Sequence, residues 1–205
     1  MNVQFLYHKY LNLFRYQRMY LAVDVHYDDN LNFARIAGVL FNSKDSILPV
    51  AAYISEIEGI EDYKAGEFYR RELPCIKKLI HDHNLVVDTL IVDGFVHLNH
   101  QPCLGAKVAE AITSIEKVIG VAKNPHKLMS SDTEVVRANS RPLYVTETGF
   151  GQREARDFVE SMHGKNRIPT MLKLVDSLCR KELTQGEYRV QELKQGHIRR
   201  MVKVG

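Results

Sequence analysis

The sequence predicts an α/β protein built on a mixed β-sheet, in which an antiparallel meander and parallel strands are flanked by helices. Three runs rich in β-formers and joined by short polar turns predict the meander, at residues 20–27, 33–41 and 47–54. Beyond them, segments with helical spacing alternate with short apolar strands. With 45% apolar and 26% charged residues, the chain of 205 residues has the composition of one globular domain, spanning residues 1–205.

The remaining elements follow from local patterns. The crowded apolar residues of 2–18 predict a helix, and a second helix has Pro74 in its first turn and ends near Asp82. Further helices are predicted at 105–116, 155–162 and 169–183, and strands at 86–93, 117–123 and 143–146. Three antiparallel strands followed by alternating helices and parallel strands form the layout of a ribonuclease H-like sheet.

Composition limits the class of protein. No apolar run approaches the roughly 18 residues of a membrane span, and the N-terminus lacks a signal-peptide pattern. A cytoplasmic protein is expected, with no membrane contact and no implied protein partner, and acting as a monomer. Cys75, Cys103 and Cys179 are odd in number and widely spaced, so they are expected to be small, buried, apolar thiols outside any disulfide or zinc site.

The net charge of +3 is unevenly distributed. Residues 1–23 and the basic C-terminal segment 184–205 each carry +3, whereas residues 24–183 sum to −3. Basic ends around an acidic middle fit a nucleic acid lying over a carboxylate cluster, and they equally fit a solvated tail.

Two acids lie on apolar strands. Asp93 ends the run Leu90–Val92 and precedes Gly94, where an open α/β sheet has its ligand crevice; an ordinary Asp-Gly turn is the alternative. Asp24 lies inside the apolar run Leu21–Val25. An ionised Asp on a buried strand is costly unless it is paired or holds a cation, so the two strands are expected to lie side by side with their acids together.

Converging carboxylates favour hard divalent cations, and two such ions can hydrolyse a phosphodiester when three or four acids hold them. Glu72 and Asp176 are the further candidates. Glu72 lies just ahead of a predicted helix and is alternatively a capping acid. Asp176 lies inside an apolar-faced helix and is alternatively an exposed partner of Lys173 or Arg180.

The order of these segments resembles the endonuclease V family. Tyr63–Glu72, followed by Leu-Pro, is similar to the family segment in which a tyrosine, a glycine and Phe/Tyr-Arg-Glu lead into Pro and a helix. Other segments agree in the same order over about residues 20–180. They are Leu21–Tyr27, Ile91–Gly94, Ile119–Lys123, Pro142–Val145, and Arg167–Pro169 through Leu174–Asp176.

The resemblance implies roles for particular residues. It gives Asp24, Glu72 and Asp93 as metal carboxylates, Asp176 as a ligand of the second metal, and Lys123 as the site lysine. The cofactor it implies is Mg²⁺, with Mn²⁺ as a substitute. The residues implied in nucleic-acid binding are Tyr63, as a wedge in the duplex, and Gly94, Gly149 and Gly151, in loops that read the base.

The sequence departs from the family pattern mainly at the positions that the family uses to recognise the base and the nucleic-acid backbone. The wedge segment Asp62–Gly66 has lost both prolines, and His100–Cys103 stands where two arginines are expected. Phe95 and Phe150 replace polar side chains at two loops, where they are expected to stack on a base without reading its edge.

The resemblance implies an endonuclease that cuts 3′ to a deaminated purine, inosine, in DNA or RNA and leaves 3′-hydroxyl and 5′-phosphate ends. The alternatives are a divergent ribonuclease H-like nuclease with another nucleic-acid target and a nucleic-acid binding module that does not cut. The four retained charged residues argue against the binding module: Asp24, Glu72, Asp93 and Lys123.

Overall fold

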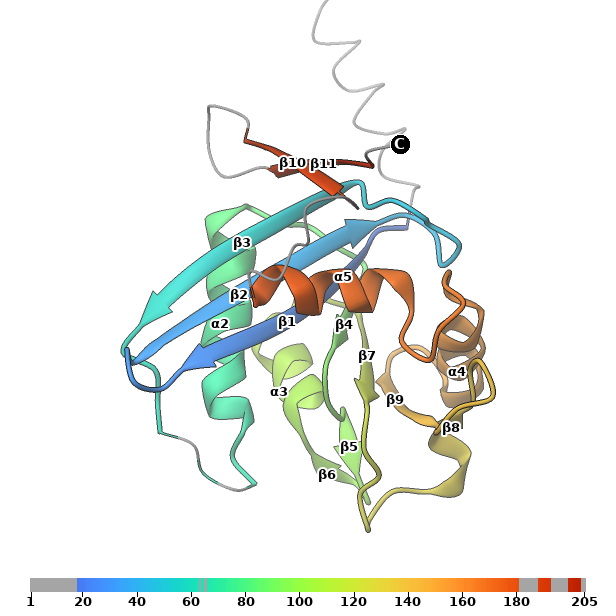
Figure 1. Cartoon of the computed structure of the whole chain (residues 1–205). Helices are drawn as coiled ribbons and strands as arrows, with labels where there is room; N and C mark the ends of the chain where they lie inside the picture. Colours follow the sequence, from blue (N-terminus) through green and yellow to red (C-terminus); the bar gives the residue numbers. More distant parts are fainter. Residues whose placement is uncertain (1–17, 63, 65, 181–187, 193–198, 204–205) are drawn as a thin grey trace, which may run out of the picture.

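The computed structural model describes residues 18–62, 64, 66–180, 188–192 and 199–203 (Figure 1). The helix predicted at residues 2–18 and the wedge residue Tyr63 therefore lie outside the described residues, Arg18 excepted.

The described residues form one mixed sheet with the strand order β10-β11-β3-β2-β1-β4-β7-β9-β8. The strands are β1 (Tyr20–Asp28), β2 (Phe33–Phe41), β3 (Ala51–Glu58), β4 (Thr89–Val92), β7 (Lys117–Ala122), β8 (Glu134–Val135), β9 (Leu143–Thr148), β10 (Tyr188–Glu192) and β11 (Arg199–Lys203). A separate small hairpin pairs β5 (His97–Leu98) with β6 (Gln101–Pro102). The helices are α2 (Tyr69–Asp82), α3 (Leu104–Ala111), α4 (Gln152–Ser161) and α5 (Thr170–Cys179), with a 3-10 turn η1 (Ser131–Thr133).

The sheet confirms the predicted mixed architecture. Strands β1, β2 and β3 form the antiparallel meander, and β1, β4 and β7 are parallel neighbours. One part of the prediction is wrong, because β9 runs antiparallel to β7. The chain reaches β9 through a long loop with the short strand β8 and no crossover helix, so it returns along β7 in the opposite direction.

Several element boundaries differ from the prediction. The third strand begins at Ala51, because residues 47–50 form a loop in which Pro49 has no N–H for a ladder. Helix α2 begins at Tyr69, so Pro74 lies inside the helix and not in its first turn, and the helix there lacks one backbone hydrogen bond.

Two other helices are shorter than predicted. Helix α3 ends at Ala111, where Ile112 leaves the helical conformation ahead of Thr113 and Ser114. Helix α5 ends at Cys179, and the rest of its predicted span is outside the described residues apart from Arg180.

Helices cover both faces of the sheet, and the alternation of side chains along β1 separates the two cores. Tyr20 and Ala22 pack in the core beneath α4 and α5, whereas Leu21, Val23 and Val25 pack in the core with α2 and α3. Figure 1 shows α5 on one face and α2 and α3 behind the other. Each strand residue near the carboxyl edge therefore belongs to one helical layer or the other.

The three cysteines are free thiols, and Cys75 and Cys179 are buried as predicted. The prediction of burial is wrong for Cys103, which is partly exposed just ahead of α3. Among the described helices, none has both the length and the apolar character to span a bilayer.

Gly120 in β7 allows the loop after β4 to cross close to the sheet. A Cβ at this position would lie 2.5 Å from the carbonyl oxygen of Gly94. Gly38 in β2 is a matched case with a different neighbour, because its Cβ would meet a terminal methyl of Leu79 at 2.6 Å. A side-chain methyl can shift, whereas the backbone of a clamped loop cannot do so cheaply.

We therefore expect Gly120→Ala to lower the free energy of unfolding by about 3 kcal/mol and Gly38→Ala by about 1 kcal/mol. Urea unfolding of both variants beside the wild type measures the difference. Equal losses would show that the loop over Gly120 moves as easily as the Leu79 side chain.

Candidate active site

Asp24 and Asp93 come together at the carboxyl edge of the sheet, as predicted. The parallel pairing of β1 with β4 sets Val23 beside Val92, so the next residue of each strand is an aspartate. Strand β4 ends there, whereas β1 continues to Asp28 with only β2 beside it. This leaves an open side on β1 at which other elements bring further side chains.

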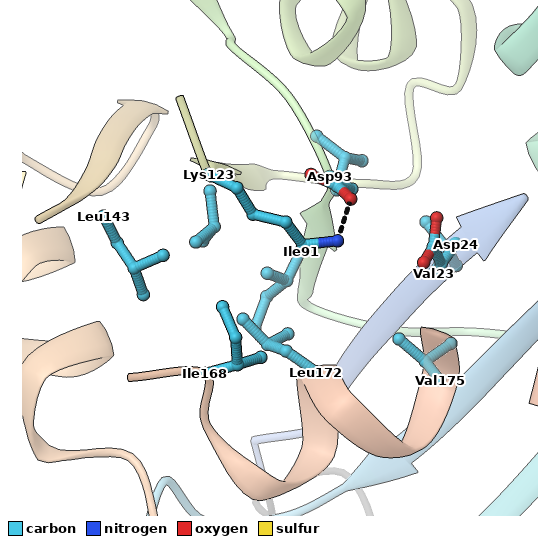
Figure 2. A pocket seen from close by; sticks show the side chains of 11 residues that line it. Val23, Asp24, Ile91, Asp93, Lys123, Leu143, Ile168, Leu172 and Val175 are labelled. Atoms are coloured by element: carbon cyan, nitrogen blue, oxygen red, sulfur yellow. Dashed lines mark hydrogen bonds and ion pairs between the residues drawn. The ribbon is translucent and has the colours of Figure 1, made fainter. Parts of the chain in front are cut away.

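Lys123 follows β7, the next parallel strand, and reaches back to the aspartates. Its Nζ lies 2.7 Å from Oδ2 of Asp93 (Figure 2). The same Nζ lies 3.7 Å from Oδ1 of Asp176. Arg167 holds the backbone at this point, because its guanidinium donates to the carbonyl oxygens of Lys123, Arg141 and Pro142. Lys123 is thus a fixed part of the acidic cluster.

Asp176 comes from α5, which covers the face of the sheet to which Asp24 belongs. It forms an ion pair with Arg180, Nε to Oδ1 3.3 Å, and it also faces Lys123. The structure thus combines the two alternatives for Asp176. It pairs with Arg180 one turn along its own helix, and it also lies beside the acids that follow the strands. A hydrogen bond also links the carboxyl groups of Asp24 and Asp176.

Glu72 approaches from the other face. It lies in the first turn of α2 and not ahead of the helix as expected, and only 6% of it is exposed. The hydroxyl of Tyr27 donates to its Oε1 at 3.0 Å. Burial raises the pKa of Glu72 to about 8; the Tyr27 hydrogen bond opposes this shift, and the charges of Asp24 and Asp93 add to it.

The strand acids also repel each other. Burial, followed by the charge of Asp93, raises the pKa of Asp24 to about 7. Against the effect of burial, the hydrogen bond with Asp24 and the positive charge of Lys123 lower the pKa of Asp176, so Asp24 is the carboxyl that keeps the shared proton. Burial would lower the pKa of Lys123, but the charge of Asp93 raises it, so Lys123 remains a cation.

This set of groups suits divalent cations. Carboxylate oxygens are the ligands that Mg²⁺ and Mn²⁺ prefer, and a cation would offset the repulsion that raises the pKa values of Asp24 and Glu72. Within the described part of the chain, no three His, Cys, Asp or Glu side chains converge as a finished metal site. Asp24, Glu72, Asp93 and Asp176 would therefore hold a cation together with water, as Mg²⁺ usually is held.

A pocket lies beneath the acids. It encloses about 340 Å³, counting the part open to solvent, and Asp24, Asp93 and Lys123 stand at its rim. Figure 2 shows their polar ends gathered above apolar side chains of the sheet and of α5. The apolar lining consists of Val23, Ile91, Val92, Val121, Leu143, Ile168, Leu172 and Val175. This surrounding of low polarity strengthens the electrostatic interactions among the charged groups.

Gly94 lies directly beside Asp93, in the loop that crosses Gly120. Its φ of 145° favours glycine, and its N–H donates to the carbonyl of Val121. Two residues later the N–H of Val96 donates to the buried hydroxyl of Thr146 at 2.8 Å. The loop after β4 is thus fixed to β7 and β9 at the edge where the acids meet.

Gly149 and Gly151 do not join Gly94. Thr148, the last residue of β9, pairs with Val118 near the start of β7, five residues before Lys123. At about 3.3 Å per residue, these glycines lie roughly 16 Å along the sheet from the carboxyl edge. The antiparallel course of β9 thus sets these two glycines at the level where β7 begins, and their part in reading a base stays a prediction.

The expectation that Phe150 stacks on a base is wrong. Phe150 is 8% exposed, packs edge-on against Phe158 and lies under the ammonium of Lys117. Phe95 differs, since it is partly exposed beside the loop of Asp93, with its ring 6.2 Å from that of His126. Of the two phenylalanines, only Phe95 is placed where it can meet a nucleotide.

The site includes two residues that sequence reasoning did not single out. Tyr27 and Arg167 have no motif-like spacing of their own to mark them. The signals available were indirect: Tyr27 stands three residues after Asp24 on a strand, and Arg167 stands in the segment before α5.

Comparison with known proteins supports this description. No protein-family model matches the chain. Endonuclease V from Streptomyces coelicolor is 25% identical over 190 residues, covering 82% of this chain and 80% of that protein. The solved endonuclease V of Streptomyces avermitilis has a TM-score of 0.68 at 23% identity, with 80% of this chain and 81% of that chain covered.

A further similar structure is Ciona intestinalis endonuclease V in complex with a 24mer DNA containing an inosine followed by a ribo-adenosine. Its TM-score is 0.64 at 18% identity, with 82% of this chain and 87% of that chain covered.

The strand order and the flanking helices define the class, a mixed α/β fold that matches the solved endonuclease V structures and has acids at its carboxyl edge. Within this class the chain is similar to endonuclease V, which confirms the predicted resemblance and supports the expected kind of enzyme, a nuclease.

The raised pKa of Asp24 predicts a pH-dependent cost in stability. The Asp24 carboxyl is ionised above its usual pKa of 3.8 in the unfolded chain, but only above about 7 in the folded protein. The free energy of unfolding therefore decreases as the pH rises between these two values. In the presence of a chelator we expect Asp24→Asn to match the wild type near pH 4 and to exceed it by about 2 kcal/mol at pH 8.

Urea unfolding at the two pH values measures this effect. Asp45→Asn, at an exposed loop position, is the control and should show no such gain. A variant of Asp24 that is no more stable than the wild type at pH 8 would contradict the buried, repelled carboxyl.

Proposed function

We propose that this protein is a metal-dependent endonuclease that hydrolyses a phosphodiester bond on the 3′ side of inosine in DNA or RNA, leaving 3′-hydroxyl and 5′-phosphate ends. The observation that carries the proposal is the meeting of Asp24 and Asp93 on neighbouring parallel strands, with Lys123 paired to Asp93. Glu72 and Asp176 add acids from the two helical layers.

Each residue has a chemical task in this proposal. The acids would hold Mg²⁺ or Mn²⁺, which supplies an activated water and neutralises charge on the phosphate. Asp24, Glu72 and Asp93 would bind the ion and fix its position, and Asp176 would help to bind it from α5. The ammonium of Lys123, fixed by Asp93 and by the Arg167 contacts behind it, offsets negative charge that develops on the reacting phosphate.

The choice of inosine is supported by the similarity to endonuclease V, which includes the Ciona protein bound to inosine-containing DNA. In this chain Gly94 lies beside Asp93, so the backbone of its loop is close enough to the acids to contact a base next to the scissile bond. Tyr63 is proposed as the wedge that fills the gap left by an extruded base.

A divergent nuclease with another nucleic-acid target is the second candidate. It is favoured by one observation: Gly149 and Gly151 follow the end of β9 that pairs with the start of β7, away from Lys123 and the acids. The cutting chemistry would be the same, and only the preferred substrate would differ.

The substrate is tested with matched single- and double-stranded DNA and RNA oligonucleotides, with and without one inosine, in Mg²⁺ and in Mn²⁺. We expect cleavage on the 3′ side of inosine, faster than cleavage of the unmodified strand, and none in a chelator. Equal cutting of both strands would reject the inosine assignment and favour the divergent nuclease. No cutting of any strand, with metal bound, would favour a binding module.

The acids are tested by substitution. Asp24→Ala, Glu72→Ala and Asp93→Ala should each lower the cleavage rate by more than about a hundredfold, since losing even a residue behind a metal ligand costs about 10–100-fold. Each variant should remain folded because the loss of a carboxylate also relieves repulsion. Asp45→Ala serves as the exposed control, and near-native activity of Asp93→Ala would exclude the proposed site.

Asp176 should behave differently from the other three acids. It is paired with Arg180 and comes from a helix and not from a strand end, so Asp176→Asn is expected to weaken metal binding without removing the site. Cleavage by this variant should recover in part as the metal concentration is raised. A loss that no metal concentration reverses would contradict its place as a helping ligand.

A further inference from the structure

Tyr27 lies in the part of β1 that continues past the end of β4. It follows Asp24 by three residues, so the alternation of the strand directs the two side chains to opposite faces. Asp24 faces α5, and Tyr27 faces α2 and packs against the core on that side. The strand that supplies the first acid thus also supplies an aromatic ring to the helix that supplies Glu72.

The first turn of α2 holds this ring on two sides. The guanidinium carbon of Arg71 lies 4.1 Å from the ring centroid, and the ring of Phe68 meets it edge-on at 6.4 Å. Arg71 is itself 6% exposed and pairs with Asp29 in the turn after β1. A ring held in this way has little freedom, so the position of its hydroxyl is fixed by the surrounding fold.

That hydroxyl contacts one of the two carboxylate oxygens of Glu72. The distance from the Tyr27 hydroxyl to Oε1 of Glu72 is 3.0 Å. Burial, and then the charge of Glu72, raise the pKa of Tyr27, so the phenol keeps its proton and acts as a donor. A carboxylate with one oxygen engaged by a rigid donor presents its second oxygen in a defined direction.

We propose that Tyr27 is a positioning residue for Glu72, whose carboxylate it orients toward the divalent cation held at the carboxyl edge. The inference rests on the proposed function, since it gives Glu72 a cation to bind. Groups that hydrogen-bond to metal ligands typically contribute about 10–100-fold to metal affinity. The alternative is that Tyr27 only fills space between β1 and α2.

The test uses Tyr27→Phe in the full chain, which keeps the ring and removes the hydroxyl. Tyr53→Phe is the matched control: Tyr53 is 8% exposed on the same face of the sheet, packs 5.0 Å from the His83 ring and lies on β3, two strands away from β1. Titration calorimetry with Mn²⁺ measures metal affinity, and thermal unfolding in a chelator measures stability.

We expect Tyr27→Phe to bind Mn²⁺ about tenfold more weakly than the wild type, and Tyr53→Phe to bind it equally well. The Mn²⁺ concentration for half-maximal cleavage should rise by the same factor, with little change in the rate at saturating Mn²⁺. A purely structural role would lower stability without moving these two quantities.

Wild-type affinity in Tyr27→Phe would overturn the inference while leaving the proposed function intact, and an equal loss in Tyr53→Phe would do the same. A wild-type chain that binds no Mn²⁺ would instead reject the proposed function and the inference with it.

Discussion

The parallel pairing of β1 with β4 is the constraint on which the site depends. Its register sets Val23 beside Val92, so two aspartates leave the sheet at the same edge. Burial, followed by the negative charge of Asp93, raises the pKa of Asp24. Two cations partly neutralise the acids at this edge: Lys123 pairs with Asp93, and Arg180 pairs with Asp176. A bound divalent cation would reduce the repulsion between the carboxylates further. The same arrangement that destabilises the metal-free site would therefore favour the metal binding that the proposed chemistry needs.

The sheet also divides the site between its two helical layers. Alternation along β1 sends Asp24 toward α5, from which Asp176 comes, and sends Tyr27 toward α2, from which Glu72 comes. Because β4 ends where β1 continues, side chains from both layers reach one edge. Neither helix could supply both acids, so the chemistry depends on the two cores packing independently against the same strand.

The two loops with candidate base-reading glycines lie at different levels along β7. The loop of Gly94 is fixed at the carboxyl edge by Val121 and Thr146, whereas Gly149 follows a strand that runs the other way. Phe150 accordingly packs in the core near the opposite edge of the sheet, and Phe95 stays near the acids.

The sequence alone determined the mixed sheet, the meander and the two strand acids, because period-two apolar runs and buried carboxylates are local signals. It also marked Glu72 and Asp176 as candidate acids, whereas Lys123 became a candidate only through the resemblance to the endonuclease V family. Strand direction is not encoded locally, so the antiparallel course of β9 was decided only by the tertiary structure. The contacts of Tyr27 with Glu72 and of Arg167 with the Lys123 carbonyl also join residues far apart in sequence, and only the packing of helices and loops on the sheet brings such pairs together.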